Sequence, residues 1–191
     1  RKKRRRRRLQ IAIVYIAMAI GLAWFFESQA TTTIIFVRHA EKEISNYDDP
    51  ELTAEGKMRV FELTRQLKDA DVVAGIDAIY STPFKRNIQT AEPLANTLGL
   101  NINIYEKNKY EDVLDEILDR FKGKIILVVG HSDTLPRLMA ELGASKKVPN
   151  IADNEYDNIY IVSIPWFGKT KTIRLRYGRP YDPDEMTRAV K

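Results

Sequence analysis

The sequence predicts an α/β fold: a three-layer α/β/α sandwich with a mainly parallel central sheet, preceded by an N-terminal transmembrane helix. Two observations predict the sandwich. Short apolar runs alternate with stretches of helical periodicity, which is typical of βαβ units and of a sheet covered by helices on both faces. The segments 33–38 and 124–129 also have uninterrupted apolar centres, as strands buried on both faces do. A third observation, an uncharged stretch at 9–26, predicts the transmembrane helix.

The first thirty residues form a unit of their own. Residues 1–8 are all basic, and the uncharged stretch that follows is 18 residues long. At 1.5 Å per residue, a helix of this length spans roughly 27 Å, close to the ~30 Å hydrocarbon core of a bilayer. Because basic flanks stay in the cytoplasm, we expect a membrane anchor whose remaining chain is exported, most simply across a bacterial inner membrane.

A cleaved signal peptide is the alternative for residues 1–30. Ser28-Gln29-Ala30 resembles a signal-peptidase site, and cleavage after Ala30 would release a secreted or periplasmic protein. The apolar stretch is longer than the usual ~7–15 residues of a signal peptide, and bulky aromatic residues occupy 24–26, close to the cleavage site. These features favour an uncleaved anchor.

Charge is distributed unevenly along the chain. The net charge is +5, but residues 1–8 contain 8 of the 31 basic residues, which leaves 23 basic and 25 acidic residues in 31–191. This part is nearly neutral, so a basic surface for nucleic acid is not expected, and the arginine run is better matched to lipid phosphate. The chain has no cysteine, which excludes disulfides, thiolate metal ligands and a cysteine nucleophile.

Residues 31–177 are expected to form the folded domain, and 178–191 an irregular polar tail. A helix at 54–69, with Thr53 as its N-cap, follows the first strand. The strand at 76–80 leads into a helix that begins with Thr82-Pro83 as N-cap and first residue and ends before Gly99. The remaining elements are strands at 102–105 and 124–129, helices at 112–121 and 134–142, and a hairpin of strands 158–164 and 171–177.

Each of the two histidines directly follows one of the buried strands. Arg38-His39 ends the first strand, and Gly130-His131 follows the fourth. Ligands of open α/β sheets bind at the carboxyl ends of parallel strands, so we expect both imidazoles at one edge of the sheet. With Arg86 near the start of a helix, they make a pocket suited to a tetrahedral dianion. This set of groups predicts phosphoryl transfer, in which one imidazole attacks phosphorus and a carboxylic acid protonates the leaving oxygen.

Four motifs resemble those of the histidine phosphatase superfamily, also called the phosphoglycerate mutase-like family. Arg38-His39-Ala40-Glu41 is similar to its Arg-His-Gly-Glu signature, with alanine in place of the commoner glycine. Leu52-Thr53-x-x-Gly56 resembles the second block of the family. Ser81-x-x-x-x-Arg86-x-x-x-Thr90-Ala91 resembles the third block, and Gly130-His131-Ser132 resembles the last. The four motifs occur in the order of the family and extend over about 33–164.

The resemblance implies a role for each residue of the predicted site. His39 would be the catalytic nucleophile that becomes phosphohistidine. Arg38, Arg86 and His131 would bind the phosphate, with His131 also stabilising the transition state. The family needs no metal or other cofactor. A zinc site formed by the two histidines and Glu41 is disfavoured, because the flanking arginines would repel the cation.

The general acid is the least certain part of the predicted site. In the family it commonly follows the strand after the Arg86 helix, which points to Glu106 as a further catalytic residue. The Gly-aromatic-Glu-Gly stretch that is usual downstream is absent here, so Glu111, Asp112 and Asp133 stay as alternatives.

We therefore expect a small, metal-independent phosphoric monoester hydrolase held at the membrane, with a phosphorylated small molecule or a lipid- or sugar-linked phosphate as substrate. A mutase is less expected, because the domain lacks room for the long insertions that enclose a mutase substrate. A phosphohistidine-protein phosphatase is one alternative, although such family members act in the cytoplasm. The other is a membrane-held, non-catalytic phosphate-binding or scaffold module.

Overall fold

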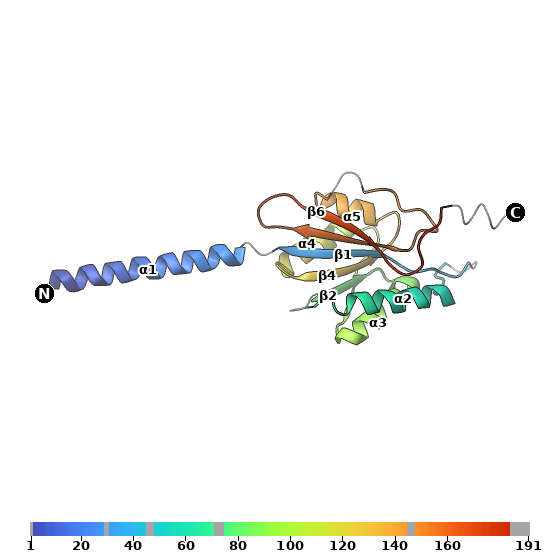
Figure 1. The fold of residues 1–191 in the computed structure, drawn as a ribbon, viewed down its shortest axis with the longest axis horizontal. Coiled ribbons are helices and arrows are strands. Elements are labelled where there is room, and N and C mark those ends of the chain that lie inside the picture. The colour runs from blue at the N-terminus through green and yellow to red at the C-terminus, as the bar shows by residue number, and fades with distance from the viewer. Residues whose placement is uncertain (1, 29–30, 45–47, 71–74, 145–147, 184–191) are drawn as a thin grey trace.

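The computed structural model describes residues 2–28, 31–44, 48–70, 75–144 and 148–183. The helix α1 (Lys2–Ser28) projects from the body, which begins at β1 (Thr32–Arg38) (Figure 1). The body then alternates α2 (Ala54–Leu67), β2 (Ala78–Ser81), α3 (Lys85–Leu98), β3 (Ile102–Ile104), α4 (Tyr110–Arg120), β4 (Ile125–Gly130), α5 (Leu135–Glu141), β5 (Asn158–Ile164) and β6 (Lys171–Arg176). Every helix and strand predicted for the body is present, and each predicted end there lies within two residues of the observed one. The helix predicted over 9–26 is longer than expected, since α1 extends from Lys2 to Ser28.

One six-stranded sheet, in the order β3-β2-β4-β1-β5-β6, forms the middle layer. The first four strands of the chain are parallel, while β5 runs antiparallel to β1 and β6 antiparallel to β5. This confirms the predicted α/β fold with a mainly parallel sheet. The antiparallel part is the hairpin that the sequence predicts at the end of the domain.

Alternating side chains of β1 build the two cores of the sandwich, because successive strand residues point to opposite faces. Ile34 and Phe36 pack in a cluster with α4 and α5, whereas Ile35 and Val37 pack in a second cluster with α2 and α3. β1 and β4 are buried on both faces, which explains their apolar sequences. The central strands therefore hold their carboxyl ends in a fixed position.

Two of the three predicted helix caps are confirmed. Thr53 Oγ1 accepts a hydrogen bond from the Gly56 amide at 3.0 Å, and Gly99 ends α3 in the left-handed conformation with φ of 67°. The predicted N-cap at Thr82 is wrong, since α3 begins only at Lys85. The Thr82 hydroxyl is instead bonded to His131, and the Asp49 carboxylate accepts the Lys85 amide at 2.9 Å. A loop distant in sequence thus caps α3.

The long helix α1 is exposed from Lys2 to Phe25. By length and composition, this segment is able to cross a membrane, either as an anchor or as a signal sequence. The proposed cleavage site falls partly on residues 29–30, outside the described residues.

Residues 178–183 contain no helix or strand, as expected for the tail, and residues 184–191 lie outside the described chain. The Tyr181 amide binds the Asp157 carboxylate at 2.8 Å, which ties the start of the tail to the body.

Candidate active site

The two histidines lie side by side at the carboxyl edge of the sheet. β1 and β4 are adjacent and parallel, and their register pairs Arg38 with Gly130. The His39 amide continues this pairing with a 3.0 Å hydrogen bond to the Gly130 carbonyl. As a result, His39 and His131 leave their strands together, with ring centroids 5.4 Å apart. Both side chains are buried.

Arg38 is held at the site by the loop that precedes β5. Its Nη1 donates to the carbonyl oxygens of Ala152, at 2.7 Å, and Glu155, at 3.1 Å. Its guanidinium lies over the ring of Tyr156, with Cζ 4.2 Å from the ring centroid. Its Nε is buried and has no hydrogen-bond acceptor among the described residues. One N–H of Arg38 is therefore available to an anion.

Arg86 brings a second guanidinium to the site from the first turn of α3. It lies over the Phe84 ring, with Cζ 4.5 Å from the centroid, and its Nη1 is 3.7 Å from the Asp49 carboxylate. Within the described part of the chain, its Nε is also buried without an acceptor. The Arg86 charge lowers the pKa of both His39 and His131, so it acts on both imidazoles.

The start of α3 is attached to the neighbouring strand ends by two polar side chains. Asn87 Nδ2 donates to the Gly130 carbonyl at 3.2 Å. Thr90 Oγ1 accepts the Ala40 amide at 3.0 Å and donates to the Arg86 carbonyl at 2.7 Å. Thr90 belongs to the third sequence motif, but the spacing of that motif does not predict the hydrogen bond between Thr90 and the Ala40 amide. These bonds fix Arg86 relative to the two histidines.

The protonation of His39 follows from the hydrogen bond that its side chain makes with a backbone carbonyl. Its Nδ1 lies 2.8 Å from the Ala40 carbonyl oxygen, which only accepts, so Nδ1 carries a proton. Burial lowers the pKa of His39 to about 3; the bond to Ala40 opposes this, while the charges of Arg38 and Arg86 and the neighbouring His131 contribute to it. The imidazole is therefore neutral at pH 7, with an unprotonated Nε2.

His131 is neutral for similar reasons. Burial, together with the charges of Lys107 and Arg86, lowers its pKa to about 4. Its Nε2 is 3.0 Å from the hydroxyl oxygen of Thr82, and its ring packs edge-on against Phe84 at a centroid distance of 5.3 Å. The ring is thus held from two sides.

Two of the predicted acids lie on loops near this edge. Glu106 follows Tyr105, whose amide binds the Ser81 carbonyl at the end of β2, and its exposed carboxylate is 3.1 Å from the Lys109 ammonium. Asp133 pairs with Lys107 at 2.7 Å. Burial raises the pKa of Asp133, but the hydrogen bond and charge of Lys107 lower it by more, so this carboxyl stays ionised.

The other two predicted acids, Glu111 and Asp112, are exposed in the first turn of α4. Glu41, which the sequence offered as a third zinc ligand, instead binds Arg59 Nε at 2.7 Å. Among the described residues, no group of three or more histidine, aspartate or glutamate side chains is arranged to hold a metal ion.

A small polar cavity of about 160 Å³ lies beside the histidines and shares Tyr156 with the site. The centroid of the Tyr156 ring is 6.0 Å from that of the His39 ring, so Tyr156 lies between the cavity and His39. The cavity is lined by Glu41, Glu55, Arg59, Asn154, Tyr156, Arg179, Pro180 and Tyr181.

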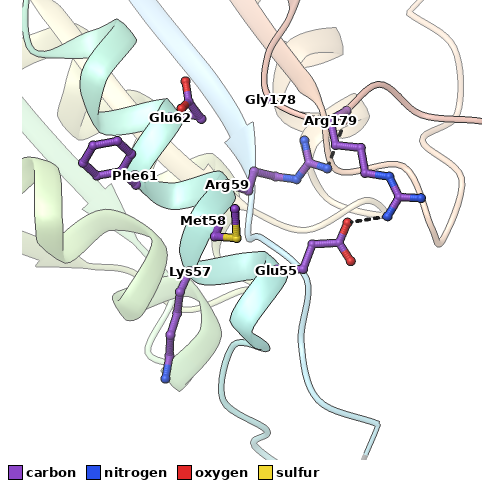
Figure 2. A pocket seen from close by; sticks show the side chains of 8 residues that line it. All are labelled: Glu55, Lys57, Met58, Arg59, Phe61, Glu62, Gly178 and Arg179. Atoms are coloured by element: carbon purple, nitrogen blue, oxygen red, sulfur yellow. Dashed lines mark hydrogen bonds and ion pairs between the residues drawn. The ribbon is translucent and has the colours of Figure 1, made fainter.

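A larger groove of about 690 Å³ runs along the outer side of α2 and is lined by neither histidine. Figure 2 shows its walls, where Met58 and Phe61 project from the helix and Arg179 approaches from the segment after β6. Arg179 Nη1 pairs with Glu55 at 2.9 Å, and its carbonyl accepts from Arg59 Nη2 at 3.1 Å. The groove therefore belongs to the packing of the C-terminal segment and not to the cluster of imidazoles.

Comparison with known proteins agrees with the geometry. Residues 34–109 match the family model of the histidine phosphatase superfamily, branch 1. This part of the body is similar to the histidine phosphatase superfamily. The matched region contains the first three motifs, with His39 and Arg86, and also contains Glu106. His131 lies beyond it, but the parallel pairing of β1 and β4 places His131 beside His39.

Solved structures share the fold of the superfamily domain. A protein histidine phosphatase SixA, determined with tungstate, has a TM-score of 0.61 and 19% identity, covering 75% of this chain and 96% of SixA. A mycobacterial glucosyl-3-phosphoglycerate phosphatase has a TM-score of 0.57 and 13% identity, covering 70% and 90%. Phosphoglycerate mutase from Plasmodium falciparum has a TM-score of 0.57 and 16% identity, covering 80% and 96%. No curated protein sequence matches the chain.

Proposed function

We propose that this protein is a phosphatase that hydrolyses phosphomonoesters through a phosphohistidine intermediate on His39. One observation carries the proposal. A neutral imidazole with an unprotonated Nε2 lies in one buried cluster with two arginines, and each arginine has a buried Nε without an acceptor among the described residues. A phosphate dianion supplies acceptors for both Nε–H groups and an electrophile for the imidazole.

The reaction takes place in two steps. In the first, His39 Nε2 attacks phosphorus in line, the bond from phosphorus to the leaving oxygen breaks, and a carboxylic acid gives that oxygen its proton. In the second, water attacks the phosphohistidine, the N–P bond breaks, and the same carboxylate accepts a proton from the water. Arg38, Arg86 and His131 stabilise the charge on the oxygens that stay on phosphorus.

Glu106 is the proposed acid, because it follows β3 and β3 ends beside β2, whose carboxyl end leads to Thr82. Asp133 is the competing residue, since its charge acts on both His131 and Arg86. The lowered pKa of Asp133 argues against it as a proton donor, because an acid that is already ionised has no proton to give.

The proposed substrate is a phosphorylated small molecule. The small cavity that borders the site at Tyr156 is lined by carboxylate, amide, phenol and guanidinium groups, which suits a polar substrate. No residue of the proposed mechanism requires a metal ion. The fold occurs in a protein histidine phosphatase and in a glucosyl-3-phosphoglycerate phosphatase, so it is compatible with a small-molecule substrate.

We also propose that α1 anchors the protein in a membrane, with the body on the exported side. The helix is exposed over Lys2–Phe25, and its basic residues 2–8 precede the apolar stretch 9–26. Lys and Arg next to a span remain on the cytoplasmic side. Once the outer membrane or cell wall has been made permeable, added protease should digest the body while the inner membrane is still intact. A body that stays protected until the inner membrane is broken would contradict this orientation.

The activity is tested with the full chain in detergent and a generic aryl phosphate. We expect turnover that resists chelators, is inhibited by vanadate and is lost in His39→Ala. Lys57→Ala, an exposed change on α2, is the matched control and should retain full activity. Quenching in alkaline detergent, in which the N–P bond of phosphohistidine is stable, should trap labelled phosphate on His39. A wild-type rate equal to that of His39→Ala, together with phosphate binding, would identify a non-catalytic phosphate-binding module instead.

A further inference from the structure

The loop between β5 and β6 exposes two adjacent aromatic side chains. Trp166 is 49% exposed and Phe167 is 82% exposed. Gly168 follows them with φ of 116°, a conformation that lets the chain turn back and leaves both rings outside the body. A contiguous apolar tip of this kind is typical of a surface that contacts a protein or a membrane.

This loop lies at the edge of the sheet where the chain arrives from α1. β5 is antiparallel to β1, and Ile164, the last residue of β5, pairs with Thr32, the first residue of β1. Ser28 ends α1, so only three residues separate the apolar helix from that pair. The loop is drawn on the side of the body that faces α1 (Figure 1).

Lysines gather at the same edge. Lys169 and Lys171 flank the turn and are exposed, as is Lys122 in the turn before β4. That turn is attached to the start of β1, because the Gly123 amide donates to Thr32 Oγ1 at 3.0 Å. Aromatic side chains prefer the interface between headgroups and acyl chains, and nearby lysines favour anionic headgroups.

We propose that the loop 165–170 docks on the bilayer that α1 spans, with Trp166 and Phe167 in the interface and the three lysines on lipid phosphates. The inference rests on the membrane anchor of the proposed function. The bilayer is the favoured partner because the anchor holds this edge within a few residues of it, and because the aromatic and basic groups match its interface.

The docked body presents its active site to the aqueous side. His39 follows Arg38, the last residue of β1. Arg38 is six residue steps from Thr32, which corresponds to roughly 20 Å along a strand. A lipid-linked phosphate at the headgroup level would have to cover this distance. The docking surface therefore selects a water-soluble phosphomonoester over a lipid-linked one.

Tryptophan fluorescence of the full chain in vesicles tests the proposal, because the chain has only two tryptophans. Trp24→Phe leaves Trp166 as the single reporter. In phosphatidylcholine–phosphatidylglycerol vesicles with brominated acyl chains, we expect Trp166 emission to be quenched and shifted to shorter wavelength. The matched control carries Trp24→Phe, Trp166→Phe and Phe61→Trp, which places the reporter at an exposed position on α2; this tryptophan should be quenched by aqueous acrylamide only.

Flotation with the vesicles separates the two hypotheses. A chain that floats but whose Trp166 is quenched only by acrylamide overturns the docking and leaves the anchor standing. A chain that does not float overturns the anchor, and the docking with it. Lipid quenching of the tryptophan at position 61 in place of Trp166 would mean that the body lies on α2, which also overturns the proposal. Hydrolysis of a soluble aryl phosphate by the same vesicles reports the phosphatase separately and should not change in Trp166→Ser/Phe167→Ser.

Discussion

Thr82 and His131 are joined by a hydrogen bond of 3.0 Å between the hydroxyl oxygen and Nε2, and both side chains are buried. Thr82 follows β2 and His131 follows β4, so the bond connects two neighbouring strands at the site. Because it occupies Nε2, the remaining nitrogen, Nδ1, is the one that His131 has left for a phosphate oxygen. The hydroxyl of Thr82 thereby selects the orientation of the imidazole.

Replacing Thr82 should impair turnover more than folding. We expect Thr82→Val to lower kcat/KM about tenfold, equivalent to ~1.4 kcal/mol, because the shape is kept while the bond to His131 is lost. Thr82→Ser retains the hydroxyl and should stay close to the wild-type rate. Steady-state kinetics on an aryl phosphate, with melting temperatures as a control for folding, measure the effect. Equal kinetics for the valine and serine variants would show that the bond has no role.

The two buried histidines should make the fold sensitive to acid. Burial lowers the pKa of His39 to about 3 and that of His131 to about 4, so the unfolded chain takes up protons first as the pH falls below about 6.5. Their stabilising contribution is complete above that pH and is lost as the pH falls toward the folded values. Between pH 7 and pH 5, the free energy of unfolding should drop by on the order of 4 kcal/mol.

Urea denaturation in phosphate-free buffer at the two pH values measures this loss. The double variant His39→Asn/His131→Asn cannot take up these protons, and its stability should change much less over the same interval. A variant with the same drop as the wild type would assign the acid sensitivity to other groups.

Arg59 should be a major contributor to stability. It is buried on α2, pairs with Glu41 at 2.7 Å and donates to the Tyr177 and Arg179 carbonyls at 3.0 and 3.1 Å. Arg59→Met leaves the Glu41 carboxylate without its partner, so we expect a loss of about 3–5 kcal/mol in the free energy of unfolding. Arg65→Met on the same helix breaks an exposed pair with Glu62 and should cost no more than about 1 kcal/mol. Denaturant titration of both variants compares them, and equal losses would contradict a special role for Arg59.

The general acid can be identified by the leaving group. An alkoxide needs a proton when it departs, whereas a nitrophenolate does not, so loss of the acid should slow alkyl esters selectively. We expect Glu106→Gln to lower kcat/KM about 100-fold for an alkyl phosphate and much less for a nitrophenyl phosphate. Asp133→Asn should affect both substrates alike. The reverse pattern would assign the role to Asp133, and no selectivity in either variant would exclude both.

The order of the elements could be predicted because each carries its own local signal. β1 and β4 have apolar centres since helices cover both faces. The two strands are parallel, so the histidines that follow them lie at one edge. The carbonyls of Ala152 and Glu155, which hold Arg38, could not be predicted, because they lie more than 100 residues away in a loop without periodicity. Tyr156 lies in the same loop, so its contact with Arg38 could not be predicted either.

The error at Thr82 has a comparable cause. A threonine before a proline at the start of a helical pattern favours an N-cap, and this local rule takes no account of a histidine on the neighbouring strand. The tertiary hydrogen bond to His131 replaced the cap, and Asp49 took over the helix end. The roles of His39, Arg38, Arg86, His131 and Glu106 stay predictions until the variants are measured.

The position of β1 also has a mechanical consequence. This strand continues from α1 and lies between β4 and β5, with six residue pairs on each side. A force that pulls the body away from a fixed α1 acts along β1. The backbone hydrogen bonds from β1 to β4 and from β1 to β5 then bear this force together, as a shear load. Strands that are pulled in this way resist extension far better than strands peeled apart one bond at a time. The chain thus passes from α1 into the fold through a strand that is hydrogen-bonded on both sides.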